Sequence, residues 1–192
     1  MSDRDPGWGF SWRVLLMLVP GAGPFFRRRA QRGGGDPLVT LRQVFTSFCV
    51  AIAGFGIVIA VLYPSYKHQE RGPLGLAAGL LIAGFTAGLV GPGIERPLDC
   101  TDDRRLAGSY RTRFFLRIAF SEVAALFGFV AFFVTYYWWA YPIGAAVAAL
   151  GFRRAAPTAA NLRHDQEILS RSGCARSLVS ALRHVNPPDG RS

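Results

Sequence analysis

One acidic residue stands inside a long apolar stretch of this sequence. Residues 114–135, FFLRIAFSEVAALFGFVAFFVT, are long and apolar enough to cross a bilayer, and Glu122 lies near their middle. A hydrocarbon core of roughly 30 Å needs about 20 apolar residues. An ionisable side chain at that depth costs roughly 2.5–3.5 kcal/mol on insertion scales. Glu122 is therefore expected to be protonated or hydrogen-bonded to a group on another helix.

Three roles for Glu122 are consistent with this chemistry. It can be a protonated acid that clamps a helix bundle by a hydrogen bond, it can exchange protons or a cation, or it can contact a ligand or a partner subunit. Arg117 lies five residues earlier, about 140° around a helix, so the two side chains do not form an ideal ion pair. The side chains that could support Glu122 are all polar: Thr46, Ser47, Thr86, Ser121 and Arg117.

The sequence around the acid resembles a motif of a known family. The setting A-x-x-E-x-x-A-L-x-G-x-V occurs here as Ala119, Glu122, Ala125, Leu126, Gly128 and Val130. It is similar to the carboxylate-bearing helix of the proteolipid c subunits of rotary ATP synthases. The resemblance covers this helix alone and implies that Glu122 binds a proton or a cation. A basic N-terminal segment and a long tail depart from that family, so we interpret the chain as c-subunit-like and not as a rotor subunit.

The composition predicts a small polytopic membrane protein. Hydrophobic residues make up 51% of the 192 positions and gather in long blocks. The net charge of +10 comes from arginines that flank these blocks and do not form one stripe. That pattern is typical of membrane-helix flanks and argues against nucleic-acid binding. Lysine occurs once, at Lys67; this bias towards arginine indicates a GC-rich genome and a bacterial plasma (inner) membrane.

We predict an all-α bundle of four transmembrane helices, at about 38–63, 73–93, 114–135 and 142–156. Pro64 is expected to end the first, and the short fourth is expected to gain length through AAPTAA. A basic interfacial segment, 1–37, precedes the 38–156 membrane domain, and a helical tail, 157–192, follows it. Arginines concentrate on one side of the four spans, so the positive-inside rule places both termini in the cytoplasm.

Small and aromatic residues predict how these helices pack and where they meet the headgroups. Residues 73–93 repeat small side chains at the four-residue spacing that lets helices approach closely. These are Gly75, Gly79, Ala83, Ala87 and Gly91, with Gly84 and Gly88 beside them. The expected interface anchors are aromatic or basic: Trp12, Arg27, Arg28, Arg29, Trp138, Trp139 and Tyr141.

The sequence contains no recognisable catalytic arrangement. It lacks a Ser/His/Asp set, a phosphate loop and an intramembrane histidine, so we expect no enzyme activity, cofactor or metal. Cys49, Cys100 and Cys174 have no metal or redox spacing. The last two fall in segments placed in the cytoplasm, where they are expected to stay reduced.

The leading hypothesis is an accessory or structural subunit of a larger membrane assembly. The expected partners are the bilayer, with its anionic cytoplasmic leaflet, and other membrane subunits or further copies of this chain. The alternative is proton or cation translocation through Glu122.

Overall fold

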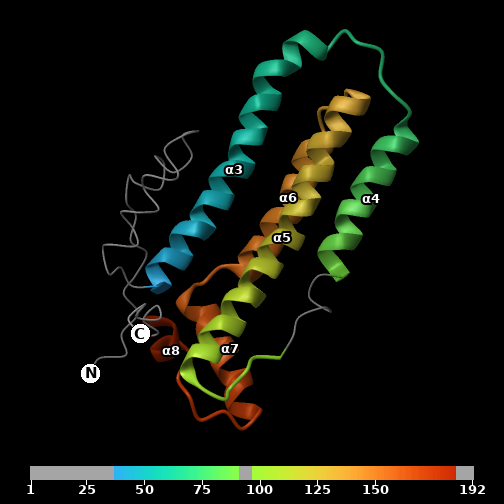
Figure 1. Ribbon diagram of the computed structural model, residues 1–192. Coiled ribbons are helices and arrows are strands. Elements are labelled where there is room, and N and C mark those ends of the chain that lie inside the picture. Colours follow the sequence, from blue (N-terminus) through green and yellow to red (C-terminus); the bar gives the residue numbers. More distant parts are fainter. Residues whose placement is uncertain (1–36, 91–96, 185–192) are drawn as a thin grey trace, which may run out of the picture. The chain divides into compact units, whose positions relative to one another are not determined.

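The computed structural model describes residues 37–90 and 97–184, in which every regular element is a helix (Figure 1). The helices are α3 (Pro37–Tyr66), α4 (Leu74–Val90), α5 (Asp103–Thr135), α6 (Ala140–Ala155), α7 (Ala159–Arg171) and α8 (Leu178–His184). The all-α prediction is confirmed for this part of the chain. By length and composition, α3 and α5 can each cross a membrane, and α4 is a shorter apolar helix.

Three helix ends differ from the prediction. α3 includes Pro64 and continues to Tyr66. α5 begins at Asp103, inside the predicted polar loop, because the Asp102 carboxylate accepts the backbone N–H of Arg105 at 2.7 Å and caps the first turn. α6 starts at Ala140 and ends at Ala155, so the expected continuation through AAPTAA is wrong.

A second helix start explains why α6 stops. Thr158 is the N-cap of α7, and its hydroxyl accepts the backbone N–H of Asn161 at 3.2 Å. The Asn161 side-chain amide then donates to the Ala156 carbonyl at 2.8 Å, which satisfies a group that the end of α6 leaves free. The helical backbone is therefore interrupted between Ala155 and Ala159, and the tail begins with a capped helix.

The described residues divide into two compact units. Unit 1 contains residues 37–47, 97–112 and 156–184, and unit 2 contains residues 48–90 and 113–155. α3 and α5 each start in unit 1 and continue into unit 2. The domains expected from the sequence followed one another along the chain. In the structure, unit 1 combines three separate stretches of chain and unit 2 combines two.

Unit 1 has its own apolar core. Its most deeply buried aliphatic side chains are Leu38, Leu106, Leu162, Leu178 and Leu182. Two charged side chains are buried with them: Arg42 is 1% exposed and Asp165 is 3% exposed. Arg42 donates from Nε to the Pro157 carbonyl oxygen at 3.0 Å. The Arg42 side chain therefore lies inside a packed helical unit, although the residue is near the start of an apolar helix.

In unit 2, α5 and α6 are held close together by glycine. A Cβ atom added to Gly128 would lie 2.8 Å from the Ala140 carbonyl oxygen and 3.2 Å from the Gly144 Cα. A Cβ on Gly144 would overlap the backbone of Ala124, and one on Gly151 would overlap the side chain of Ser121. Real side-chain carbons do not approach this closely, so this interface requires glycine at these positions.

α4 uses only part of its small-residue repeat for packing within the chain. A Cβ on Gly84 would lie 3.0 Å from the Phe127 Cβ and 3.1 Å from the Ala124 Cα, so this glycine packs directly on α5. Gly88 makes an ordinary contact and Ala87 is half-buried. A Cβ on Gly75 or Gly79 would meet open space, and these glycines and Ala83 are exposed. Gly91 lies outside the described residues.

An aromatic cluster joins α3 to α5 and α6. Phe55 and Phe129 lie 5.0 Å apart between ring centroids, and the Tyr66 ring stacks on Tyr136 at 5.3 Å. Tyr141, expected at the membrane interface, is 6% exposed and its hydroxyl donates to the Ile52 carbonyl. It therefore acts in packing.

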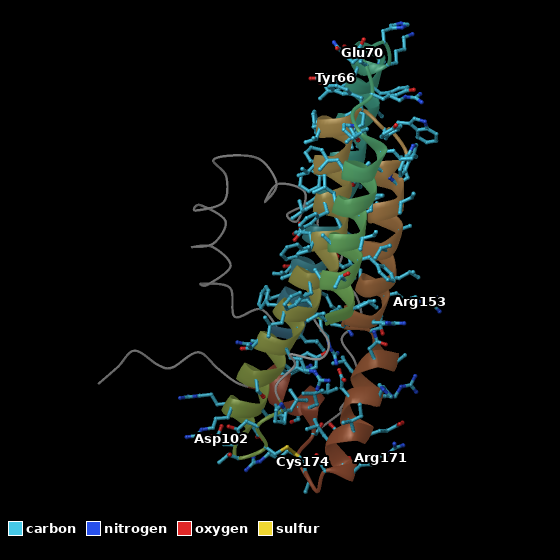
Figure 2. The ribbon with its side chains drawn as sticks, turned by 90° about the vertical axis from the view of Figure 1, so that its right-hand side faces the viewer. Tyr66, Glu70, Asp102, Arg153, Arg171 and Cys174 are labelled. Atoms are coloured by element: carbon cyan, nitrogen blue, oxygen red, sulfur yellow. A yellow bond between two sulfur atoms is a disulfide. The ribbon has the colours of Figure 1, made fainter. Side chains whose placement is uncertain are left out.

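The two ends of unit 2 differ in chemistry. Figure 2 shows Tyr66 and Glu70 at one end of this unit and Arg153 towards the other. Among the predicted anchors near the aromatic end, Trp138 is exposed and Trp139 is half-buried. Trp12, Arg27, Arg28 and Arg29 fall outside the described residues.

We predict that Gly144→Leu destabilises the protein and that Gly79→Leu does not. The first places a side chain into backbone, and overpacking of this kind costs about 1–3 kcal/mol or more. The second enters open space, so the free energy of unfolding is expected to change by less than about 0.5 kcal/mol. Thermal unfolding in detergent, followed by circular dichroism, measures both; equal losses of stability would contradict the packing described here.

We also predict that Arg42 and Asp165 compensate each other's charge, because a buried charge left alone is strongly unfavourable. Arg42→Met and Asp165→Asn are each expected to lower the free energy of unfolding by about 3 kcal/mol. The double variant should lose clearly less than the sum. Additive losses in this double-mutant cycle would show that each charge is stabilised independently of the other.

Candidate functional site

Glu122 lies on a face of α5 that no helix in residues 37–90 and 97–184 fully covers. Helical spacing places it on the same side as Phe115, seven residues before it, and Ala119, three residues before it. Leu126, four residues after it, lies on the same side. Phe115 is 47% exposed and Leu126 is 38% exposed, and Ala119 is also exposed. Glu122 itself is half-buried. The acid therefore stands at the edge of an apolar surface that we call the open face of α5, formed by Phe115, Ala119, Glu122 and Leu126.

This acid is remote from both ends of its helical segment. It lies nine residues beyond Arg113, where the part of α5 that belongs to unit 2 begins, and thirteen before Thr135, where the helix ends. At 1.5 Å per residue these separations are about 14 Å and about 20 Å. A glutamate side chain cannot reach past either end of such a segment, so its polar partner must come from beside the helix.

In the described part of the chain, Glu122 makes no hydrogen bond and no ion pair. The hydroxyl groups expected to support it donate to the backbone carbonyl four residues earlier on their own helices. These bonds are Thr46 to Arg42 at 3.0 Å, Ser47 to Gln43 at 3.0 Å, Thr86 to Ile82 at 2.8 Å and Ser121 to Arg117 at 2.7 Å. Such back-bonds satisfy a hydroxyl in an apolar setting without a second helix.

Arg117 does not neutralise the acid either. It is half-buried, and the structure contains no ion pair between it and Glu122. This agrees with the five-residue spacing, which sets the two side chains on different sides of α5. The groups expected to support the acid are thus present in the fold, and none of them makes a hydrogen bond or an ion pair with it.

Packing accounts for some of the small residues near Glu122. Ala124 is 3% exposed and contributes to the contacts of α5 with both α4 and α6, and Gly128 faces Gly144. Of the residues that carry the c-subunit resemblance, Ala125 and Gly128 are buried, whereas Ala119, Leu126 and Val130 are exposed. The buried members pack the helix against its neighbours, and the exposed members lie on the side where Glu122 stands.

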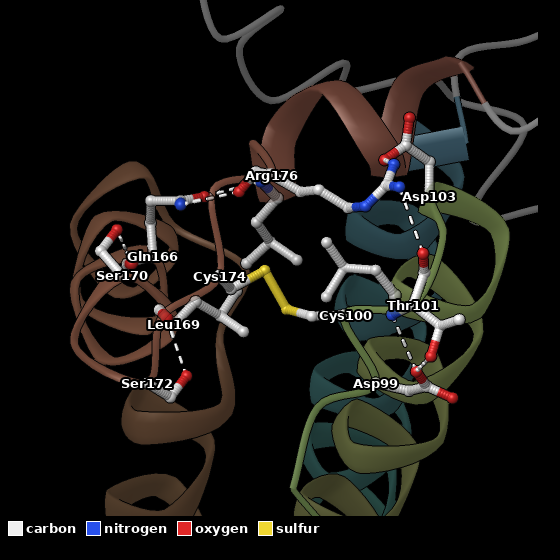
Figure 3. Close-up of a disulfide and its surroundings, with 12 residues drawn as sticks. Asp99, Cys100, Thr101, Asp103, Gln166, Leu169, Ser170, Ser172, Cys174 and Arg176 are labelled. Carbon is white, nitrogen blue, oxygen red and sulfur yellow. Dashed lines mark hydrogen bonds and ion pairs between the residues drawn. A yellow bond between two sulfur atoms is a disulfide. The ribbon is translucent and has the colours of Figure 1, made fainter.

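The cysteines behave differently from the expectation. Cys100 and Cys174 form a disulfide, with their Cα atoms 6.0 Å apart, although 74 positions separate them in the sequence (Figure 3). The expectation of two unpaired, incidental thiols is therefore wrong. The fold of unit 1 brings the segment before α5 next to the turn between α7 and α8. Cys49 is free and half-buried.

Polar contacts surround this disulfide. Arg176 pairs with Asp103 at 2.7 Å and donates to the Thr101 carbonyl at 3.1 Å. The Thr101 hydroxyl and backbone N–H both donate to Asp99, which holds the pKa of that carboxyl below its ordinary value. No group of three or more His, Cys, Asp or Glu side chains suited to a metal occurs among the described residues.

The comparisons with known proteins provide no relative from which a function can be transferred. No family model matches the chain, and neither a curated protein nor a solved structure matches it. Glu122 and the open face of α5 are therefore the features of this protein that indicate a function.

Proposed function

We propose that this protein is an accessory subunit of a membrane assembly, and that the open face of α5 docks onto a partner subunit. The observation that carries the proposal is an acid in the middle of an apolar helix, beside exposed apolar side chains, with no polar partner among the residues that the structure describes. The partner supplies the group that satisfies Glu122.

The proposal requires unit 2 to lie in a bilayer. In a soluble protein, helices as apolar as these are mostly buried, but only 11% of the most apolar part of α3 and 39% of that of α5 are buried. Large apolar side chains are exposed on the other two helices as well: Ile82 of α4 is 65% exposed and Leu150 of α6 is 64% exposed. Lipid is the solvent that suits such surfaces on all four helices.

Helix length is compatible with four spans. α4 has 17 residues and α6 has 16. At 1.5 Å per residue they are about 24–26 Å long, which is somewhat less than the roughly 30 Å of a hydrocarbon core. Modest thinning of the bilayer and side chains that extend to the headgroups accommodate such a difference. We therefore retain the four-helix, multi-pass arrangement in a bacterial inner membrane.

The orientation rests on the distribution of basic residues. Arg113, Arg153 and Arg154 belong to one end of unit 2, and only Lys67 and Arg71 belong to the described connection between α3 and α4 at the other. The positive-inside rule then orients the arginine-rich end, and the chain termini, towards the cytoplasm.

Docking relieves the free-energy penalty of Glu122. A charged or unpaired acid facing lipid costs roughly 2.5–3.5 kcal/mol on insertion scales. A hydrogen-bond donor or a cation from a partner helix removes most of that penalty. The exposed stripe of Gly75, Gly79 and Ala83 on α4 adds a second surface where another helix can approach closely.

A second candidate function is proton or cation translocation through the same acid. It is favoured because Glu122 has no fixed partner within the described part of the chain and can exchange a proton, as the resemblance to c subunits implies. Glu122 is, however, the sole carboxylate in α3, α4, α6 and the part of α5 from residue 113 onward. A path across the membrane would therefore require groups from another copy or from a partner.

We expect Glu122→Leu to remove the partner that co-purifies with the tagged full chain from native membranes in mild detergent. Loss of the contact should reduce recovery about tenfold, which corresponds to about 1.4 kcal/mol. Glu70→Gln, at an exposed acid in the α3–α4 connection, is the matched control and should leave recovery unchanged. A wild-type chain that is monomeric in native membranes, or full recovery of the partner with Glu122→Leu, would overturn the proposal.

The second candidate predicts that a hydrophobic carbodiimide, which reacts with protonated carboxyls in lipid, labels Glu122. In vesicles containing the purified chain, labelling and Glu122→Gln should each abolish proton flux driven by a potassium diffusion potential. Glu70→Gln should again have no effect. Flux that persists in Glu122→Gln would exclude this function and leave the docking proposal intact.

A further inference from the structure

The disulfide of unit 1 joins two segments that are also held together without a covalent bond. Cys100 precedes α5, and Cys174 lies in the turn between α7 and α8. Two residues beyond Cys174, Arg176 reaches back to Asp103 at 2.7 Å and to the Thr101 carbonyl at 3.1 Å (Figure 3). The same two segments are thus connected twice, once by sulfur and once by a guanidinium group.

The proposed orientation gives this disulfide an unusual setting. If the arginine-rich end is cytoplasmic, unit 1 lies in a compartment that keeps thiols reduced, where disulfides are mostly transient and redox-sensing. We propose that Cys100 and Cys174 are a reversible thiol–disulfide pair that responds to the redox state of the cytoplasm. This inference rests on the proposed orientation and not on the docking of Glu122.

The exposure of the two sulfurs suggests an order of reaction. Cys100 is half-buried, whereas Cys174 is 7% exposed. The Cys100 thiolate attacks a low-molecular-weight disulfide, forms a mixed disulfide and releases one thiolate. The Cys174 thiolate then attacks the Cys100 sulfur, closes the protein disulfide and releases the second thiolate. Two protein thiols are oxidised, and one small disulfide is reduced to two thiols.

Arg176 prepares the second step. Its contacts keep the segment that holds Cys100 beside the turn that holds Cys174 when the sulfur bond is open. The ion pair is exposed, with 42% and 57% of the two side chains accessible, so it is a weak link that aligns the thiols without replacing the disulfide. Oxidation therefore turns a weak connection into a covalent one at the base of α5, the helix that carries Glu122.

The experiment counts free thiols on the full chain in inverted inner-membrane vesicles. Cys49→Ser removes the third cysteine, and a polyethylene-glycol maleimide reports the number of free thiols by gel shift. The chain from unstressed cells should carry two tags, the chain treated with oxidised glutathione none, and the chain then treated with dithiothreitol two again. A disulfide already closed in unstressed cells, thiols that stay free under oxidised glutathione, or a stable mixed disulfide would each overturn the proposal.

Two pairs of variants distinguish an aligned thiol pair from an accidental one. Arg176→Ala should slow closure of the disulfide several-fold, whereas Arg171→Ala, at an exposed arginine on the last turn of α7, should close at the wild-type rate. In single-cysteine variants, Cys174→Ser should accumulate the glutathione adduct at Cys100, and Cys100→Ser should react slowly at the buried Cys174. Equal rates for Arg176→Ala and Arg171→Ala, or faster modification of Cys174 than of Cys100, would contradict the proposed order.

Discussion

The close approach of α5 and α6 is the constraint on which the arrangement of unit 2 depends. Gly128 and Gly144 face each other so tightly that a methyl group on either would strike the backbone of the other helix. This contact fixes the rotation of α5 about its axis. With Ala124 and Gly128 turned inward, helical periodicity directs Glu122 towards the side that α3, α4 and α6 leave open. The exposure of the acid therefore follows from a glycine contact elsewhere on the same helix.

An acid in that position has few ways to be stable. The hydroxyls that could reach across a bundle are already bonded within their own helices, and Arg117 lies on another side of α5. In the membrane setting that we propose for unit 2, lipid supplies no hydrogen-bond donor in the hydrocarbon region. A partner helix that carries a hydrogen-bond donor or a cation would stabilise the carboxyl group of Glu122 through assembly. A bound proton would stabilise it by removing the charge. Docking and proton exchange are thus two responses to one physical constraint.

Some of this structure could be predicted from the sequence because it depends on local composition. Apolar blocks separated by polar and proline-rich segments predicted the helices, and the end of α5 at Thr135 coincides with the end of the predicted 114–135 stretch. The start of the same helix could not be predicted as well, since it depends on a single cap at Asp102. Glu122 could be identified from the sequence because a single acidic residue among apolar residues needs no tertiary information to stand out.

Other features depend on contacts between distant parts of the chain. The partner of Cys100 lies 74 positions away, and no local spacing signals it. In the sequence, Arg42 is one of several arginines near the ends of apolar blocks. In the structure its side chain is buried and donates to the Pro157 carbonyl, which lies far away in the sequence. The small-residue repeat of α4 suggested close packing, but a one-dimensional repeat does not distinguish Gly84, which contacts α5, from Gly79, whose added Cβ would meet open space. These distinctions require the rotation of each helix, which only tertiary contacts determine.

We propose that another protein covers the open face of α5. A photo-activated amino acid placed at Ala119, one turn before Glu122 on that face, tests this in intact membranes. Leu150, on the exposed side of α6, is the comparison site. If a partner covers this face, position 119 forms a defined protein cross-link that is lost when Glu122→Leu is added. Cross-links to lipid alone from position 119, as from a helix surface facing only the bilayer, would contradict it.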